Sequence, residues 1–208
     1  MPSSVAHRRQ LAFFVDAAKC TNCKTCEAAC KDFHDAPAGC RLRRVRAFES
    51  GEFPQVAVYH LSMSCNHCED PVCVRGCPAG AYSKRAGDGI VVHDAERCIG
   101  CRYCTWLCPY GAPQYDPELG RVRKCDLCVD ELEQGRPPVC VAACPLRAIE
   151  IGWLAEIAAR PGVVILLPEL PSPGLTQPAY RYKLRVASAA AAVENGSGWM
   201  PRTGRNPG

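Results

Sequence analysis

The sequence has little of what usually builds a large catalytic domain or a membrane protein. Only 7% of its 208 residues are aromatic, which leaves little bulk for filling a large apolar core. The longest apolar run late in the chain, residues 163–167, is far shorter than the roughly 18 residues of a membrane span. The sequence has no glycine-rich nucleotide loop and no residue set typical of a catalytic triad. The sequence therefore indicates neither a membrane span nor an independent catalytic site, and something other than apolar burial must hold the protein together.

Two arginines near the N-terminus invite comparison with a twin-arginine export signal. Arg8 and Arg9 are followed by a short apolar stretch, residues 11–15, and then by Asp16. An export signal needs an apolar region of about 7–15 residues and a cleavage site. We therefore expect the two arginines to belong to a basic N-terminal arm.

Cysteine, by contrast, is abundant: the chain has 17, together with 17 glycines and 18 prolines. So many cysteines suggest disulfides, zinc or iron–sulfur clusters. Because 17 is odd, a complete disulfide framework would leave one thiol over. Attached c-type haem is excluded, since no C-x-x-C pair is followed by histidine. The cysteines are the obvious candidates for holding this loop-rich chain together.

All but one of the cysteines fall into four groups of four. The groups are Cys20, Cys23, Cys26 and Cys30; Cys65, Cys68, Cys73 and Cys77; Cys98, Cys101, Cys104 and Cys108; and Cys125, Cys128, Cys140 and Cys144. The first and third groups have the C-x2-C-x2-C-x3-C spacing of bacterial ferredoxins. The second group stretches the middle gap to four residues and the fourth stretches it to eleven. The last three groups end in Cys-Pro, whereas the first ends in Cys30-Lys31.

This spacing favours a cubane cluster over a zinc ion. Two-residue gaps let a tightly wound loop deliver three thiolates to three corners of a cubane, and in two-cluster ferredoxins the fourth cysteine ligates the other cluster. Zinc predicts paired C-x-x-C knuckles separated by a finger. Three cysteines within seven residues, present twice, suit the cubane better.

The positions of the groups predict the organisation of the protein. The second and third groups lie close together, as in a single ferredoxin module. The first and fourth groups are far apart in the sequence and must come together in the fold. We therefore predict an α+β, loop-rich fold of two ferredoxin-like modules, one inserted in the other. The outer module is expected at residues 11–55 plus 121–152 and the inner module at residues 56–120. Residues 153–208 lack cysteine and become rich in Pro, Gly and Ser, which predicts a C-terminal extension that wraps a partner or is disordered.

Local patterns predict a few short elements within these modules. Strands are expected in the LAFFVD segment, residues 11–16, and at residues 90–92 after a turn containing Gly87 and Gly89. Short helices are expected after the Cys-Pro steps, in the segments PAGAYS, PYGAPQ and PLRAIE.

Four stretches of the sequence resemble a known family. They are FFVDAAKCTNCKTCEAACKD, SCNHCEDPVCVRGCPAGAYSKR, DGIVVHDAERCIGCRYCTWLCPYGAPQYD and KCDLCVDELEQGRPPVCVAACPLRAIEIG. Together they resemble the iron–sulfur subunit of the dimethyl sulfoxide reductase family of molybdopterin oxidoreductases. The resemblance covers roughly residues 11–152 and is dense within every cysteine group.

The resemblance implies four [4Fe–4S] clusters and assigns their ligands. The implied sets are Cys20, Cys23, Cys26 and Cys144; Cys125, Cys128, Cys140 and Cys30; Cys65, Cys68, Cys73 and Cys108; and Cys98, Cys101, Cys104 and Cys77. Some relatives have tryptophan at the position of Cys101 and carry a three-iron cluster there, so four irons are expected here. The cluster of Cys20 is expected nearest the molybdenum subunit and that of Cys98 nearest the membrane anchor.

The resemblance also implies a role. The protein is expected to be an electron-transfer subunit without an active site of its own. It would relay electrons from an integral-membrane quinol-oxidising anchor to a molybdopterin catalytic subunit that reduces an S- or N-oxide. The expected location is the periplasmic face of a bacterial inner membrane, after export together with the catalytic partner; the cytoplasmic face is the alternative. Other hypotheses are the same relay in a tetrathionate or polysulfide reductase, formate dehydrogenase or hydrogenase complex, or a zinc-stabilised scaffold with no redox role.

Several cations and isolated residues complete the set of candidates. Lys24, Arg102 and Lys124 are close in sequence to the cysteines, and we expect them near the bound clusters. Cys40 lies outside every group and is interpreted as a free or packed thiol. His67 lies between two expected ligands and is interpreted as a residue that tunes or shields a cluster.

Charge gives two further expectations. Arg41, Arg43, Arg44 and Arg46 form a basic run that predicts a solvated face or, alternatively, a contact with an acidic partner or anionic lipid. Binding four oxidised clusters through sixteen thiolates would change the formal net charge of +4 to roughly −4. Nucleic-acid binding is therefore disfavoured.

Overall fold

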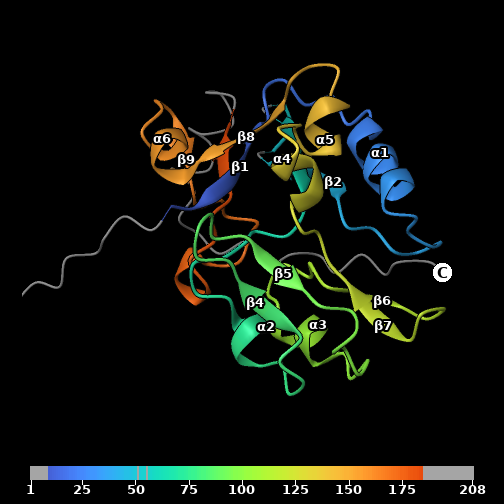
Figure 1. Ribbon diagram of the computed structural model, residues 1–208. Coiled ribbons are helices and arrows are strands. Elements are labelled where there is room, and N and C mark those ends of the chain that lie inside the picture. Colours follow the sequence, from blue (N-terminus) through green and yellow to red (C-terminus); the bar gives the residue numbers. More distant parts are fainter. Residues whose placement is uncertain (1–8, 51, 55, 185–208) are drawn as a thin grey trace, which may run out of the picture.

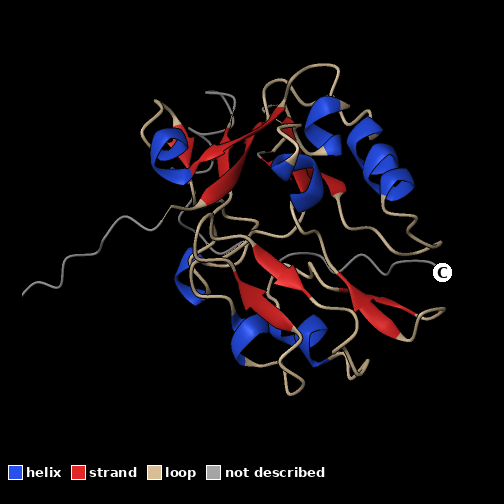
Figure 2. Ribbon diagram, in the orientation of Figure 1, coloured by secondary structure: helices blue, strands red, loops and turns tan. Residues whose placement is uncertain are grey.

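The computed structural model describes residues 9–50, 52–54 and 56–184, and shows a mixed α/β protein of short elements joined by long loops (Figures 1 and 2). The strands are β1 (Leu11–Asp16), β2 (Arg44–Ser50), β3 (Ala57–Met63), β4 (Tyr82–Lys84), β5 (Val91–His93), β6 (Gln114–Asp116), β7 (Arg121–Arg123), β8 (Ile149–Trp153), β9 (Val163–Val164) and β10 (Arg181–Lys183). The helices are α1 (Thr25–Phe33), α2 (Val72–Arg75), α3 (Tyr103–Leu107), α4 (Val129–Glu133), α5 (Val139–Ala142), α6 (Leu154–Ala158) and the 3-10 turn η1 (Pro173–Leu175).

A four-stranded sheet in the order β8-β1-β10-β9 ties the two ends of the described region together. Its central strand β1 is the predicted LAFFVD strand, and it pairs antiparallel with β8 and parallel with β10. Because β1 has a strand on each side and apolar residues on both faces, five of its six residues are buried. Phe14 packs toward Ile157 of α6, whereas Phe13 lies on the other face and packs on Tyr180 with ring centroids 5.4 Å apart.

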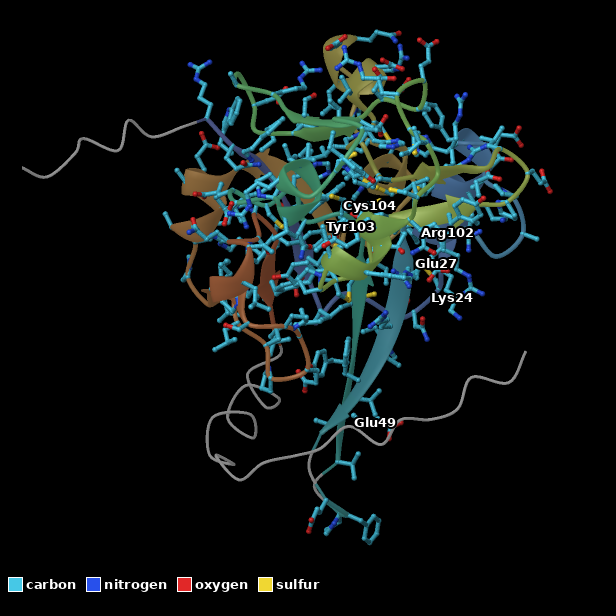
Figure 3. All side chains as sticks on the ribbon, turned by 90° about the horizontal axis from the view of Figure 1, so that it is seen from below. Lys24, Glu27, Glu49, Arg102, Tyr103 and Cys104 are labelled. Atoms are coloured by element: carbon cyan, nitrogen blue, oxygen red, sulfur yellow. The ribbon has the colours of Figure 1, made fainter. Side chains whose placement is uncertain are left out.

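Three separate hairpins make up the other sheets: β2–β3, β4–β5 and β6–β7. The β2–β3 hairpin is the longest, with pairing that runs from Arg44 opposite Met63 to Ser50 opposite Ala57. Figure 3 shows this hairpin projecting from the body of the molecule, with Glu49 near its far end. The strand expected at residues 90–92 is present as β5, shifted by one residue.

Figure 1 shows two halves, and the helices that carry the cysteine groups are divided between them. In one half, α1, α4 and α5 lie near the end of the sheet formed by β1 and β8. In the other half, α2 and α3 lie below the hairpins β4–β5 and β6–β7. Helices α1 and α5 are far apart in sequence but pack against each other, which brings the first cysteine group to the fourth.

The helices do not lie where the sequence analysis expected them. The short helices α2, α3 and α5 come before the Cys-Pro steps, and turns follow each step. The prediction of helices in PAGAYS, PYGAPQ and PLRAIE was therefore wrong. Proline disfavours the helical conformation of the residue before it, so the helix ends before the cysteine that precedes the proline. The backbone of Cys108, for example, is extended, with φ −76° and ψ 112°.

The expected C-terminal extension also differs from the structure over its first half. Residues 153–184 contain α6, β9, η1 and β10 and contribute buried side chains, among them Ile157, Leu167 and Tyr180. The segment is folded because β1 needs a partner on its second edge, and β10 supplies it. The rest of the predicted extension, residues 185–208, lies outside the described residues.

Two smaller expectations concern a membrane span and the isolated cysteine. Within the ranges that the structure describes, no helix has both the length and the apolar character needed to cross a bilayer. Cys40 is buried in the main core and forms no disulfide, which agrees with its interpretation as a packed thiol.

The basic run at residues 41–46 is not the uniformly solvated face expected from its sequence. Arg41 and Arg46 are exposed and Arg44 is half-buried, but Arg43 is only 1% exposed. The expectation was wrong for Arg43 because this side chain, directly before β2, is held in the core by hydrogen bonds to Ser62, Ser64 and Tyr180.

Candidate iron–sulfur cluster sites

Three cavities in the structure are each lined by four cysteines, three from one sequence group and one from another. The first set is Cys20, Cys23, Cys26 and Cys144; the third set is Cys65, Cys68, Cys73 and Cys108; and the fourth set is Cys77, Cys98, Cys101 and Cys104. The three cavities have similar empty volumes, about 330, 350 and 280 Å³ with the adjoining open solvent included.

The remaining four grouped cysteines form the second set, which consists of Cys30, Cys125, Cys128 and Cys140. All four are buried. Burial raises the pKa of the Cys30 thiol, and the neighbouring Cys125, Cys140 and Cys128 raise it further. Four thiols gathered in this way without solvent are suited to sharing a bound group that neutralises their charge as thiolates.

Short helices connect the sets in pairs. Cys26 and Cys30 lie four residues apart on α1, and one belongs to the first set and the other to the second. Residues four apart on a helix face the same side and are separated by about 6 Å along its axis. Cys140 on α5 and Cys144 just after it make the same connection from the other side. The third and fourth sets are connected in the same way, through Cys73 and Cys77 at α2 and through Cys104 and Cys108 at α3.

The first C-x-x-C pair of each cysteine group contains a left-handed residue directly before its second cysteine. These residues are Asn22, His67, Gly100 and Leu127, with φ of 60°, 44°, 70° and 66°. Leucine rarely adopts this conformation, so the turn at Leu127 is strained and must be held by its surroundings. Left-handed turns of this kind direct successive backbone N–H groups into one concave space, which is suited to an anion.

Backbone amides already donate to several of the sulfurs. The N–H of Ala81 donates to Cys77 Sγ at 3.3 Å, and the N–H of Ala148 donates to Cys144 Sγ at 3.2 Å. Both donors lie four residues after their cysteine, at the end of the turn that proline begins. The same kind of bond joins His67 N to Cys65 Sγ at 3.5 Å. Donors of this type stabilise thiolates that bind a metal cluster.

The spacing of the sulfurs tests whether a zinc ion or a larger group fits. Tetrahedral zinc with Zn–S bonds of about 2.3 Å requires sulfurs about 3.8 Å apart. Among the described residues, no three cysteines have Sγ atoms that all lie within 4.8 Å of one another. The four sets of thiols are therefore too open for a single ion, while four soft sulfur donors around a cavity fit an iron–sulfur cluster.

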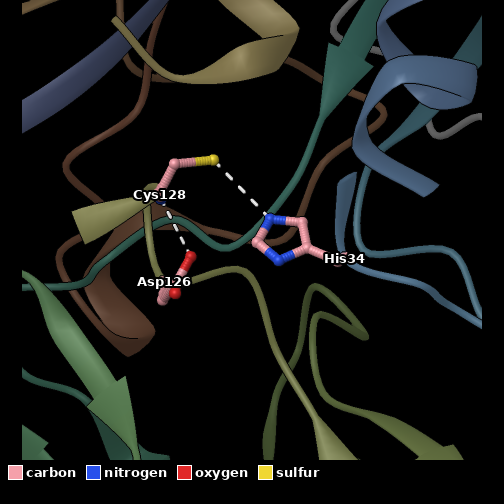
Figure 4. A group of neighbouring side chains, drawn as sticks. All are labelled: His34, Asp126 and Cys128. Atoms are coloured by element: carbon pink, nitrogen blue, oxygen red, sulfur yellow. Dashed lines mark hydrogen bonds between the residues drawn. The ribbon is translucent and has the colours of Figure 1, made fainter. Parts of the chain in front are cut away.

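A mixed cluster of potential ligands, His34, Asp126 and Cys128, was not foreseen from the sequence (Figure 4). His34 lies just after α1, and its Nε2 is 3.6 Å from Cys128 Sγ. An Asp126 carboxylate oxygen accepts a hydrogen bond from the Cys128 N–H at 2.8 Å. Because Cys128 belongs to the second set, His34 and Asp126 are best understood as neighbours that orient this cysteine. A histidine so distant in sequence from Cys128 gives no local signal of this contact.

The three predicted cations lie at different depths. Lys124 is buried, and its Nζ donates to the carbonyl oxygens of Val91 at 2.5 Å and Cys125 at 2.6 Å and lies 3.7 Å from Cys65 Sγ. Lys24 and Arg102 are exposed and line the cavities of the first and fourth sets. Both have left-handed backbones at the start of a helix, with φ of 60° and 62°.

His67 is a buried residue of the framework beside the third set. Its Nδ1 accepts a hydrogen bond from the Val91 N–H at 3.1 Å, so this nitrogen carries no proton. Burial lowers the pKa of His67 well below its usual value, and Lys124 and Lys84 lower it further. A neutral imidazole shields the sulfurs from water without adding charge.

Comparisons with known proteins agree with these observations. Residues 56–154 match a family model described as a 4Fe–4S dicluster domain. The sequence is 45% identical over 177 residues to the B subunit of anaerobic dimethyl sulfoxide reductase from Escherichia coli K12, with 81% of this sequence and 86% of that protein covered. It is 43% identical over 178 residues to the corresponding subunit from Haemophilus influenzae, with the same shares covered. The formate dehydrogenase iron-sulfur subunit of Wolinella succinogenes is 36% identical over 162 residues, with 67% of this sequence and 80% of that protein covered.

Proposed function

Because this protein belongs to the family of anaerobic dimethyl sulfoxide reductase iron–sulfur subunits, which transfer electrons and have no active site of their own, we propose that it relays electrons through four [4Fe–4S] clusters. Each cluster, when bound, accepts and releases single electrons within a range of potentials that the protein sets. The four sets of cysteines described above are the proposed ligands. The observation that carries the proposal is the succession of thiol sets connected by helical turns.

The exposure of the cysteines supports an order for the proposed relay. Cys23 of the first set and Cys101 of the fourth set are exposed, whereas every cysteine of the second set is buried. Helices join the first set to the second and the third to the fourth. Lys124 supports a link between the middle pair, since it contacts Cys65 of the third set and the carbonyl of Cys125 of the second. We therefore propose the order first, second, third, fourth, with the ends open to partners.

The protein's own residues would hold the clusters and keep water away. The cysteines supply all the ligands, so each proposed cluster is saturated and leaves no iron open to a substrate, in contrast to a catalytic metal site. The amides of Ala81 and Ala148 donate to ligand sulfurs, and Leu127, fully buried, packs beside the second set. This arrangement suits electron transfer and not chemistry on a substrate.

The two exposed ends differ in character, which supports two different partners. Beside the first set, Lys24, Lys31 and Arg41 line an open groove, which favours an acidic surface such as that of a molybdopterin catalytic subunit. Around the fourth set, Ile99 and Trp106 are 69% and 83% exposed. Exposed apolar side chains of this size favour burial against another protein, and we propose an integral-membrane quinol-oxidising anchor here.

The division into modules follows from the same sets. We propose that residues 11–55 with 121–152 form one ferredoxin-like module, which holds the first and second sets, and that residues 56–120 form a second module inserted into it. The continuous run of ligands from Cys65 to Cys108 supports the inserted module. The packing of α1 against α5 supports the discontinuous one.

The proposals for the substrate and the compartment are based on sequence similarity to relatives. We propose an S- or N-oxide as the terminal acceptor and the periplasmic face of a bacterial inner membrane as the location, with the cytoplasmic face as the alternative. The 36% identity to a formate dehydrogenase iron-sulfur subunit supports a second candidate function, in which the same relay serves a dehydrogenase.

Metal analysis tests the proposal directly. After anaerobic purification, the full-length protein is expected to contain about sixteen iron atoms and sixteen sulfides, from four cubanes. It is also expected to accept electrons from dithionite and yet reduce no S- or N-oxide until a molybdenum subunit is added. About eight iron atoms, stoichiometric zinc, or turnover by the isolated protein would contradict the proposal.

A further inference from the structure

Arg43 is a charged residue that lies buried in the protein. Its side chain is 1% exposed, although Arg41, two residues earlier, is exposed. A buried cation is stable only when opposite charge and hydrogen-bond acceptors compensate for the lost hydration. Arginine also keeps its proton in proteins, so it cannot escape this requirement by becoming neutral.

Most hydrogen-bond partners of Arg43 are neutral hydroxyl groups. Its Nη1 donates to Ser62 Oγ and Tyr180 Oη, both at 2.9 Å, and its Nη2 donates to Ser64 Oγ at 3.1 Å. The guanidinium lies 4.3 Å from the centre of the Phe13 ring. Its Nε has no hydrogen-bond partner, and none of the salt bridges between described residues includes Arg43. The hydroxyls orient the guanidinium but do not balance its charge.

Cysteine sulfurs of two sets are the neighbours that can balance this charge, as thiolates. Ser62 Oγ, which accepts from Arg43, lies 3.2 Å from Cys26 Sγ of the first set. The side chain of Arg43 also donates a hydrogen bond to Cys140 of the second set. Cys26, Cys30 and Cys125 are further electrostatic neighbours of the guanidinium. All three belong to the buried core that contains Phe13, on whose ring the guanidinium packs. Arg43 therefore lies between the first and second sets and faces sulfurs of both.

We propose that Arg43 is a positioning residue that serves as the shared internal counter-cation of the clusters in the first and second sets, and that its charge raises the reduction potentials of both. Reduction adds one electron to a cluster and transfers no proton to Arg43, which is already protonated. The added negative charge lies close to a cation in a medium of low dielectric, so the reduced state gains more stabilisation than the oxidised state. Without Arg43, both clusters would be harder to reduce.

The other half of the molecule supplies the contrast. Lys124 contacts Cys65 of the third set, whereas the cation that lines the fourth set, Arg102, is exposed, so that solvent screens its charge. The effect of Arg43 should therefore be confined to two of the four clusters. This inference rests on the proposed ligand sets, which iron and sulfide analysis of the unsubstituted protein tests separately.

The experiment is a potentiometric titration of the cluster-loaded full-length protein, followed by electron paramagnetic resonance. Arg43→Gln removes the charge and keeps hydrogen-bonding capacity, while Arg43→Lys keeps the charge. Arg46→Gln is the matched control, since it removes the same charge from an exposed position on β2, the strand that follows Arg43. For Arg43→Gln we expect two of the four midpoint potentials to fall by at least about 59 mV. For a one-electron reduction, this shift corresponds to a tenfold change in the equilibrium constant. Arg43→Lys should restore most of this shift, and Arg46→Gln should leave all four potentials unchanged.

Each outcome decides the proposal. Loss of iron in Arg43→Gln with normal iron and potentials in Arg43→Lys would support it, because charge and not shape would then be required to hold the clusters. Loss of iron in both variants would overturn it, because Arg43 would then be a packing residue. Unchanged potentials in Arg43→Gln, or an equal shift of all four potentials, would also overturn it.

Discussion

The two halves of this molecule contain the same local arrangement of cysteines on helical turns but are assembled in different ways. In each half, helical turns place two cysteines four residues apart, so that neighbouring sets are one turn from each other. The third and fourth sets draw all their cysteines from one continuous segment, from Cys65 to Cys108. The first and second sets draw theirs from two segments far apart in the sequence, which the pairing of β1 with β8 and the packing of α1 on α5 bring together.

The halves also differ in how deeply the sulfurs lie. The second set is completely buried and faces the internal cation Arg43, whereas Cys101 of the fourth set is exposed beside apolar side chains. A continuous segment can form its sites with little surrounding structure, and its sites stay near the surface. A discontinuous pair needs a sheet to join it, and that sheet supplies the core that covers its sulfurs.

The largest effect is expected from a substitution that interrupts the relay at the fourth set. In the assembled complex, Cys104→Ser should abolish quinol-driven reduction of the acceptor, because the proposed anchor delivers electrons to this end. Reduction driven by a viologen dye should largely survive, because a soluble dye can donate elsewhere along the relay. Parallel assays with the two donors measure this difference. Equal loss with both donors would rule out the fourth set as the entry point.

A second pair of substitutions compares the two exposed ends. Cys101→Ser and Cys23→Ser each remove the exposed cysteine of a terminal set. Each should convert one cluster into a three-iron species, with a loss of about one iron atom per protein molecule and a new paramagnetic signal in the oxidised state. Metal analysis and electron paramagnetic resonance of both variants provide the test. An unchanged spectrum for either variant would remove that cysteine from its set.

A third substitution tests whether the segment after the last cysteine belongs to the folded half that contains the four-stranded sheet. Ile157 on α6 is fully buried and packs with Ala12, Phe14 and Ala179. Ile157→Ala should lower the free energy of unfolding by about 2–5 kcal/mol through the cavity that it leaves. The shift in thermal unfolding followed by circular dichroism measures it. The control is Leu166→Ala at a position 59% exposed, which should change stability by less than about 0.5 kcal/mol. Equal effects of the two would mean that α6 is not part of the core.

The smallest effect is expected for Cys40→Ser. Cys40 is buried but belongs to none of the four sets, so iron content and potentials should not change. Stability should fall by about 1 kcal/mol, because the new hydroxyl is buried. Iron analysis with a thermal unfolding curve checks both statements. The loss of one cluster would show that the ligand sets are wrong.

Much of the chemistry could be predicted from the sequence because it depends on local spacing. The C-x-x-C pairs, the family resemblance and the strand at β1 could all be identified, and comparison with relatives confirms the resemblance. The helices expected after the Cys-Pro steps were wrong, although the rule that misplaced them is also local. Proline ends a helix at or before the preceding residue, and the short runs before each step, such as residues 72–75, were not predicted as helices.

By itself, the sequence determined which atoms can bind a cluster, because two-residue gaps and the turns that they force are properties of neighbouring residues. Only the tertiary structure decided how deeply the sulfurs lie and which cation faces them. Arg41 and Arg43 illustrate the reason. They are the same residue in the same basic run, yet one is exposed and the other is buried by Ser62 and Tyr180, which are distant in sequence. Burial depends on long-range packing, and no local pattern records it.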